Sequence, residues 1–168
     1  MAGDHKQDPD VQLMLKAGAG DLQSFESLVV KHQKSVLNAA YRYTGNPSVA
    51  EELAQDVFVR VFRAAPTYKP EARFSTWLFT IVRNVCSNYR MRQGKHDHQM
   101  DAESDLYALS QNDENPEEAA IRNELESKIQ KAVLALPESL RMPLILSQFQ
   151  QMSYEEIANV LELSVAAV

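Results

Sequence analysis

Apolar residues recur every three or four positions through most of the chain, which is the spacing of one face of an α-helix. This period predicts helices over residues 22–44, 47–65, 74–92, 116–136 and 154–163, with a further helix beginning at 137. The two-residue alternation typical of a strand is found nowhere. The sequence therefore predicts an all-α protein.

Residues that cap helices mark the same boundaries. Polar residues that accept hydrogen bonds from free N–H groups precede several segments, in two places followed by a proline in the first turn. These signals are Asp21, Asn46–Pro47, Asn115–Pro116 and Ser153, the last paired with Glu156 as a capping box. Gly45 and Gly94 are natural helix stops, and Pro143 is expected to kink the helix that contains it.

The chain divides by charge into two helical domains and a linker. Its 168 residues carry a net charge of −6, which by itself argues against a nucleic-acid binder. Residues 1–93, however, hold 12 Lys and Arg against 9 Asp and Glu, whereas residues 94–120 hold 1 against 8. We therefore expect domains at 10–93 and 116–168, joined by a flexible acidic linker at 94–115.

The segment 66–92 combines basic and aromatic side chains. Five cations accompany one acid, Glu71, and they alternate with Tyr68, Phe74, Trp77, Phe79 and Tyr89; the cations are Lys69, Arg73, Arg83, Arg90 and Arg92. Cations bind phosphates and aromatic rings stack on unpaired bases, so the segment suits single-stranded nucleic acid. The alternative is that Trp77 belongs to the core and the cations face solvent.

Two further patterns each have a functional and a structural interpretation. Glu52, Gln55 and Asp56 share one helix face, which either docks a basic partner or is simply a solvated face. Ser153–Leu163 followed by a helix capped at Ser164 has the layout of a helix-turn-helix, or of a plain helical hairpin. Val168 falls one turn into that last helix, so we expect a truncated reading helix.

The sequence gives little support for catalysis. It lacks a glycine-rich phosphate loop, a nucleophile motif and the HExxH pattern, so neither an enzyme nor a cofactor is expected. His96 and His98 with Asp101 and Glu103 leave a metal-dependent enzyme as a weak alternative, and no metal is predicted. The lone Cys86 and the absence of a membrane-spanning run indicate a cytoplasmic protein.

Four motifs together resemble the sigma factors of bacterial RNA polymerase, in the extracytoplasmic-function (ECF) group. They are AGDLQSFESL at 19–28, AEELAQDVF at 50–58, RFSTWLFTIVRN at 73–84, and LPESLR at 136–141 running into MSYEEIA at 152–158. The resemblance covers nearly the whole chain. It implies a transcription initiation factor that directs core polymerase to promoters.

The resemblance also implies roles for particular residues. The domain at 10–93 would recognise and melt the minus-ten element, and the helix-turn-helix at 116–168 would face the minus-35 element. The strand-capturing residues would be Arg73, Phe74, Thr76, Trp77, Arg83, Asn84, Arg90 and Arg92. The polymerase-docking residues would be Glu51, Glu52, Gln55 and Asp56, and the helix-turn-helix residues Ser153, Glu156, Ser164 and Val165.

The partners implied are core RNA polymerase, through the clamp coiled coil of its largest subunit and its flap, promoter DNA, and an anti-sigma factor. The linker would thread near the polymerase active site. The protein would be nucleoid-associated with polymerase, or held at the inner membrane by the anti-sigma factor without inserting. The alternative function is a helical adaptor that binds polymerase or another partner without touching DNA.

Overall fold

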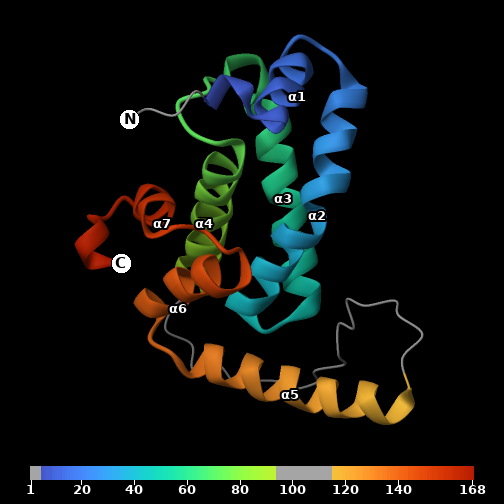
Figure 1. Ribbon diagram of the computed structural model, residues 1–168, viewed down its shortest axis with the longest axis vertical. Coiled ribbons are helices and arrows are strands. Elements are labelled where there is room, and N and C mark those ends of the chain that lie inside the picture. Colours follow the sequence, from blue (N-terminus) through green and yellow to red (C-terminus); the bar gives the residue numbers. More distant parts are fainter. Residues whose placement is uncertain (1–4, 94–114) are drawn as a thin grey trace.

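The computed structural model describes residues 5–93 and 115–168, and the regular structure of these residues is helical (Figure 1). The first part contains α1 (Pro9–Gly18), α2 (Leu22–Thr44), α3 (Pro47–Ala64) and α4 (Phe74–Gln93). The second part contains α5 (Pro116–Ala135), α6 (Glu138–Leu144) and α7 (Tyr154–Leu161). Short 3-10 turns occupy His5–Gln7, Ala65–Thr67 and Val165–Ala167, and a π turn occupies Ile145–Phe149. The all-α prediction is confirmed.

The predicted helix starts are confirmed by their caps. The Asp21 carboxylate accepts hydrogen bonds from the N–H groups of Gln23 and Ser24, and Asn46 accepts from Val49. Ser153 and Glu156 form the reciprocal capping box at α7. Each cap satisfies donors that have no partner inside the first turn of a helix.

Pro143 lies inside α6, and the π turn that begins at Ile145 interrupts the i→i−4 ladder next to the proline. Two features differ from the sequence prediction. The helix α1 was not predicted; its ten residues bury Val11, Met14 and Asp10. Ser164 does precede a helical turn, but its side chain makes no capping bond and the turn is 3-10. Gly94 and the linker at 94–114 lie outside the described residues.

The first module is a bundle built on the α2–α3 hairpin. α4 packs against both helices of the hairpin, and α1 lies across one end of the bundle beside α2 (Figure 1). The core is a set of apolar side chains with at most 1% exposure, among them Val11, Met14, Leu28, Val36, Val57, Val61, Phe74, Leu78 and Val82. The helical period of the sequence accounts for this packing.

The second module packs directly on the first. α7 lies beside α4, and α5 crosses the end of α2, where a Cβ on Gly45 would come within 2.5 Å of Leu134 Cδ1. Gly45 also has a φ of 72°, so a side chain there would be disfavoured twice. Val133, Ile145, Leu146, Ile157 and Val160 join the same buried cluster as the first module.

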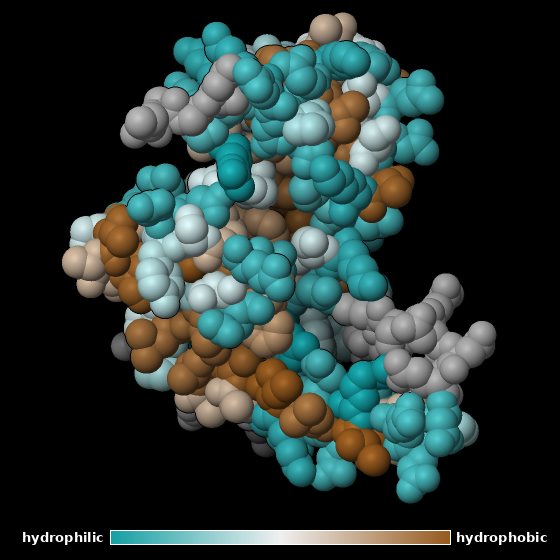
Figure 2. Space-filling model, viewed as in Figure 1, coloured by the Kyte–Doolittle hydropathy of each residue, from teal (hydrophilic) through white to brown (hydrophobic). Residues whose placement is uncertain are grey.

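The exposed surface of the second module keeps some large apolar side chains. Ile121, Leu125 and Leu140 are each more than half exposed, and Figure 2 shows apolar residues along α5 and α6 on this face. Among the described residues, no helix is both long and apolar enough to cross a membrane.

Candidate nucleic-acid interface

The start of α4 is fixed by a residue far away in the sequence. Asp8 Oδ2 accepts a hydrogen bond from the Phe74 N–H at 3.0 Å, while its Oδ1 accepts from the Asp10 N–H at 3.0 Å. The residue just before α4 is Arg73, which has no acceptor to offer as a cap. One carboxylate therefore caps α1 and α4 together and ties down the loop 68–73.

An aromatic cluster lies where this loop meets α4. The ring centroids of Tyr68 and Trp77 are 4.8 Å apart at 70°, and those of Phe74 and Trp77 are 5.7 Å apart. Phe74 is 1% exposed and also packs on His32, with centroids 5.2 Å apart. Phe74 is thus placed beneath the surface, where it supports Trp77, and the half-buried Trp77 belongs to the outer face.

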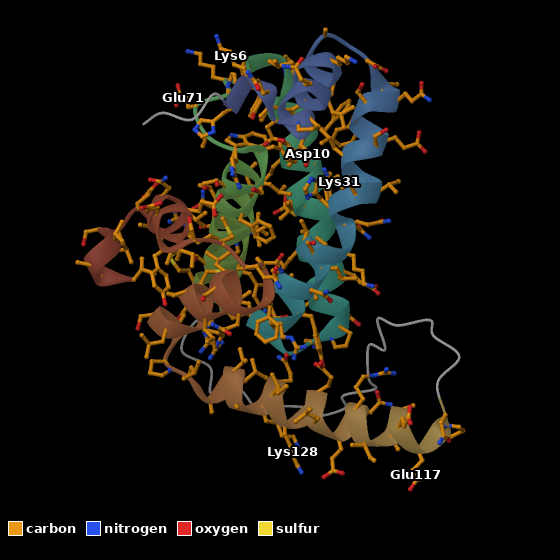
Figure 3. All side chains as sticks on the ribbon, in the orientation of Figure 1. Lys6, Asp10, Lys31, Glu71, Glu117 and Lys128 are labelled. Atoms are coloured by element: carbon orange, nitrogen blue, oxygen red, sulfur yellow. The ribbon has the colours of Figure 1, made fainter. Side chains whose placement is uncertain are left out.

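A hollow of about 390 Å³ opens beside Trp77. Its lining combines the loop, one face of α4 and one residue of α7: Ala64, Thr67, Tyr68, Lys69, Glu71, Ala72, Thr76, Trp77, Thr80 and Asn159. The Tyr68 hydroxyl is buried without a hydrogen-bond partner among the described residues, and burial raises the pKa of Tyr68 to about 12. The hydroxyl is a hydrogen-bond donor whose proton has no acceptor among these residues. Figure 3 labels Glu71 on the loop, near the end of the bundle that carries α1.

The structure brings some of the predicted strand-capturing residues together and separates others. Thr76 and Trp77 meet at the hollow, although Thr76 is 4% exposed. Asn84 is exposed two turns further along α4, about 10 Å away by helix rise. Arg90 and Arg92 lie two further turns on, so the predicted residues form a line along α4 and not one pocket.

Three of the predicted arginines contact acids of the second module. Arg73 Nη1 lies 3.6 Å from Glu156 Oε1, and Arg90 Nε lies 3.7 Å from Glu138 Oε2. Arg83 Nε donates to the Val160 carbonyl at 3.1 Å, and its Nη2 lies 3.4 Å from Glu162 Oε1. Sequence reasoning did not anticipate these pairs, because each joins residues at least 48 positions apart.

The predicted docking residues lie on α3. Glu51, Glu52 and Gln55 are exposed, and Asp56 accepts two hydrogen bonds from Arg60, from Nε at 3.1 Å and Nη2 at 3.0 Å. Val59 and Phe62 continue the surface of α3 with 45% and 49% exposure. This combination of acids and apolar side chains is suited to a partner that is both basic and apolar.

The predicted helix-turn-helix residues are divided between two surroundings. Ser153 and Glu156 cap α7, and Glu156 also faces Arg73 of the first module. Ser164 is exposed and Val165 is 51% exposed in the last turn. Between them, Glu162 ends α7 in the left-handed conformation with a φ of 58°.

Sequence reasoning missed several residues of this interface. Tyr68 and Lys69 were noted in the basic and aromatic segment, and Thr80 shares a helix face with Trp77, but none of the three was among the predicted strand-capturing residues. Asp8 precedes Pro9 and so had a recognisable cap signature, which was overlooked. Its bond to Phe74 and the position of Asn159 in the hollow have no local sequence signal.

The metal-dependent alternative gains no support from the part of the chain that the structure describes. Within residues 5–93 and 115–168, no group of three or more His, Cys, Asp or Glu side chains is arranged to hold a metal ion. His96, His98, Asp101 and Glu103 lie outside these residues.

Comparison with known proteins identifies the two modules. The sigma-70 region 2 family matches residues 28–96, and the sigma-70 region 4 family matches residues 126–168. The RNA polymerase sigma-H factor of Pseudomonas aeruginosa is 31% identical, over 96% of this chain and 87% of its own length. The ECF RNA polymerase sigma-E factor of Escherichia coli K12 is 29% identical, over 95% of this chain and 86% of its own length.

A solved structure has the same fold. CnrH, in its complex with the cytosolic domain of CnrY, matches with a TM-score of 0.68 and 26% identity, over 94% of this chain and 86% of CnrH. The two helical modules, their basic and aromatic face and the similarity to these relatives together define the class of protein. It is a transcription initiation factor of the sigma type. The chain belongs to the sigma-70 family, in its ECF group. It is not an enzyme, and its partners are core RNA polymerase and promoter DNA.

Proposed function

We propose that α4 and the loop 68–73 capture the unpaired strand of the minus-ten element. The observation that carries this proposal is the hollow beside Trp77, which Tyr68 and Lys69 of the loop and Thr76 of α4 also line. A base flipped out of the duplex loses stacking worth a few kcal/mol, and a pocket that stacks and hydrogen-bonds the base returns that free energy. Arg73, Arg83, Arg90 and Arg92 would hold phosphates along α4, with Asn84 at a base edge.

Replacing Asn84 tests strand capture, because its exposed side chain can be removed without disturbing the core. In polymerase assembled with N84A, promoter opening measured by permanganate reactivity of unpaired thymines should fall several-fold while polymerase affinity is unchanged. W77A should do the same, and the control K34A, at an exposed position of α2, should not. Wild-type opening by N84A and W77A would refute strand capture and favour the adaptor alternative.

We also propose that Glu51, Glu52, Gln55 and Asp56 dock on the clamp coiled coil of the largest polymerase subunit. Three of these side chains are exposed on one helix, where a basic partner can reach them. Reversing two charges with E52K/D56K should abolish polymerase binding in a pull-down with purified core enzyme. The same reversal at exposed acids of α5, E117K/E118K, serves as the control. Equal binding by the two variants would contradict this docking site.

The second module would contact the polymerase flap and the minus-35 element through the turn at Ser153–Val165. The match of residues 126–168 to region 4 and the capped helix α7 support this role. Transcription by the assembled polymerase should fall when the minus-35 element of a template is replaced. Equal transcription from both templates would contradict a reading role for this module.

An anti-sigma factor is a further proposed partner. The support is that CnrH, a structural relative, is solved with the cytosolic domain of CnrY bound. A protein of this kind should compete with core polymerase for the chain in size-exclusion chromatography. A bound protein that leaves polymerase affinity unchanged would not be an anti-sigma factor.

A further inference from the structure

A buried carboxylate joins α1 to α2 close to the aromatic cluster of α4. The Asp10 side chain is 10% exposed; its Oδ1 accepts a hydrogen bond from Lys31 Nζ at 2.7 Å, and its Oδ2 lies 2.8 Å from His32 Nε2 (Figure 3). A carboxylate has no proton to donate, so Nε2 carries the hydrogen of the second bond. The two partners are consecutive residues of α2 in different surroundings, because the Lys31 side chain is 56% exposed and that of His32 is 12% exposed.

The His32 ring is connected to the hollow through one intermediate ring. Its centroid lies 5.2 Å from that of Phe74, and the Phe74 centroid lies 5.7 Å from that of Trp77 and 6.4 Å from that of Tyr68. Phe74 is 1% exposed, so its ring cannot turn away from these neighbours without disturbing the close-packed core. The Phe74 ring is therefore held by His32 on one side and limits where Trp77 can lie on the other.

The bond to Asp10 explains how a polar ring is kept among aromatic side chains. A buried imidazole N–H without an acceptor would lose the hydrogen bond that it makes with water, which costs free energy. Asp10 supplies that acceptor with one oxygen, while its other oxygen is paired with Lys31. The hydrogen bond therefore allows the His32 ring to stay against Phe74.

We infer that His32 is a positioning residue for strand capture. It is not among the residues that line the hollow; it holds Phe74, and Phe74 keeps Trp77 in its orientation beside the hollow. This inference rests on the proposed role of α4 and the loop 68–73. Its consequence is that a substitution in α2, outside the basic and aromatic segment, alters promoter opening and leaves polymerase affinity unchanged.

Lys31 provides a matched control, because both residues bond to the same carboxylate and the ring contact with Phe74 belongs to His32. H32A and K31A each leave Asp10 with one of its two partners. Promoter opening is measured by permanganate reactivity of unpaired thymines, in polymerase assembled with each variant at equal occupancy. We expect H32A to lower opening about three- to tenfold, as for the loss of one aromatic contact, and K31A to change it less than about twofold. Equal opening by H32A and K31A, with W77A still impaired, would overturn the inference.

Two further variants separate the ring from the hydrogen bond, and they also cover the case in which H32A does not fold. H32F keeps a ring against Phe74 and gives up the bond to Asp10, whereas H32Q keeps an N–H group that can reach Asp10 and gives up the ring. H32F should open promoters within about twofold of the wild type, and H32Q should show the loss expected of H32A. Normal opening by H32Q with impaired opening by H32F would overturn the inference, because the ring would then not be what positions Phe74.

Trp77 reports its own position without DNA. It is the only tryptophan of the chain, and its near-ultraviolet circular dichroism depends on how its ring lies against Tyr68 and Phe74. In the free chain, H32A and H32Q should weaken the tryptophan band, and K31A and H32F should retain it. An unchanged band in both H32A and H32Q would overturn the inference.

The two measurements distinguish failure of this inference from failure of the function on which it rests. If α4 does not capture the strand, the tryptophan band changes in H32A and not in K31A, while H32A, N84A and W77A all open promoters normally. If His32 does not position Trp77, H32A matches K31A in both measurements while W77A still impairs opening.

Discussion

Asp8 offers the sharpest test of how the chain supports the face that we propose captures the promoter strand. Its two carboxylate oxygens accept from the N–H groups of Asp10 and Phe74, each at 3.0 Å, so D8A uncaps α1 and α4 in one substitution. Loss of an N-cap typically costs about 1 kcal/mol, and hydrogen bonds to a charged group are worth about 1.5–3 kcal/mol. We expect D8A to lower the free energy of unfolding by about 2–4 kcal/mol.

Two comparison variants show whether the loss of stability in D8A comes from one cap or from two. D8N retains one carbonyl acceptor and can cap one helix, so it should lose about half as much stability. N46A removes a cap that serves α3 alone, through one bond of 3.2 Å to Val49, and should cost about 1 kcal/mol. The predicted order of stability is therefore wild type, then N46A and D8N, then D8A.

The assay is urea unfolding followed by circular dichroism at 222 nm and by Trp77 fluorescence, which lies in α4. If the two signals give coincident transitions, unfolding is two-state, and the urea midpoint multiplied by the slope m gives the free energy of unfolding. For a chain of this size, 1 kcal/mol corresponds to about 2–4 °C in Tm, which gives an independent check. A D8A midpoint equal to that of N46A would show that the bond to Phe74 contributes nothing.

Three further predictions follow from buried or capped groups. Cys86 is 1% exposed and burial raises its pKa to about 12, so maleimide should label it at the rate of unfolding; fast labelling of native protein would contradict this packing. R141K should lower stability by about 2–3 kcal/mol in urea unfolding, because the Arg141 guanidinium donates to three carbonyls, including that of Tyr43. The hydrogen bond from the Ser24 hydroxyl lowers the pKa of Asp21 below its ordinary 3.8. The ionised Asp21 carboxylate therefore stabilises the folded state at neutral pH, and this stabilisation is lost as the pH falls through the pKa that Asp21 has in the folded state. S24A should therefore shift the urea midpoint at pH 7 but hardly at about pH 2; equal shifts would contradict the linkage.

The sequence predicted those parts of the fold that depend on local signals. Helical period and caps located α2, α3, α4, α5 and α7, since a cap such as Asn46 and the stripe that includes Leu53 and Val57 act within a few residues. The helix α1 was not predicted, although it begins with a capping residue and a first-turn proline. Its cap, Asp8, was readable, but the second bond of Asp8 joins residues 66 positions apart.

The candidate site was predictable in composition and not in accessibility. A basic and aromatic pattern pointed to Arg73, Trp77 and Arg83; the last two lie along α4 and Arg73 directly precedes it. The same pattern gave no reason to place Phe74 beneath the surface or Arg83 against a backbone carbonyl of α7. Depth and partner choice are decided by how helices dock, which depends on many weak contacts spread over the chain.

The docking of the two modules also changes what the charge of the chain means. A net charge of −6 predicts poor binding to DNA, because contacts to phosphate dominate nonspecific affinity. Three glutamates that produce part of this charge lie beside arginines of the first module, so the second module neutralises part of the basic face of the first. Each such pair is worth about 0.2–1 kcal/mol when exposed, so separating three of them costs far less than the binding free energy of a typical protein complex. Separating the modules would also expose Ile157 and Val160, which are completely buried in the core that the two modules share, so apolar burial and not the ion pairs is the larger part of the free energy that holds them together.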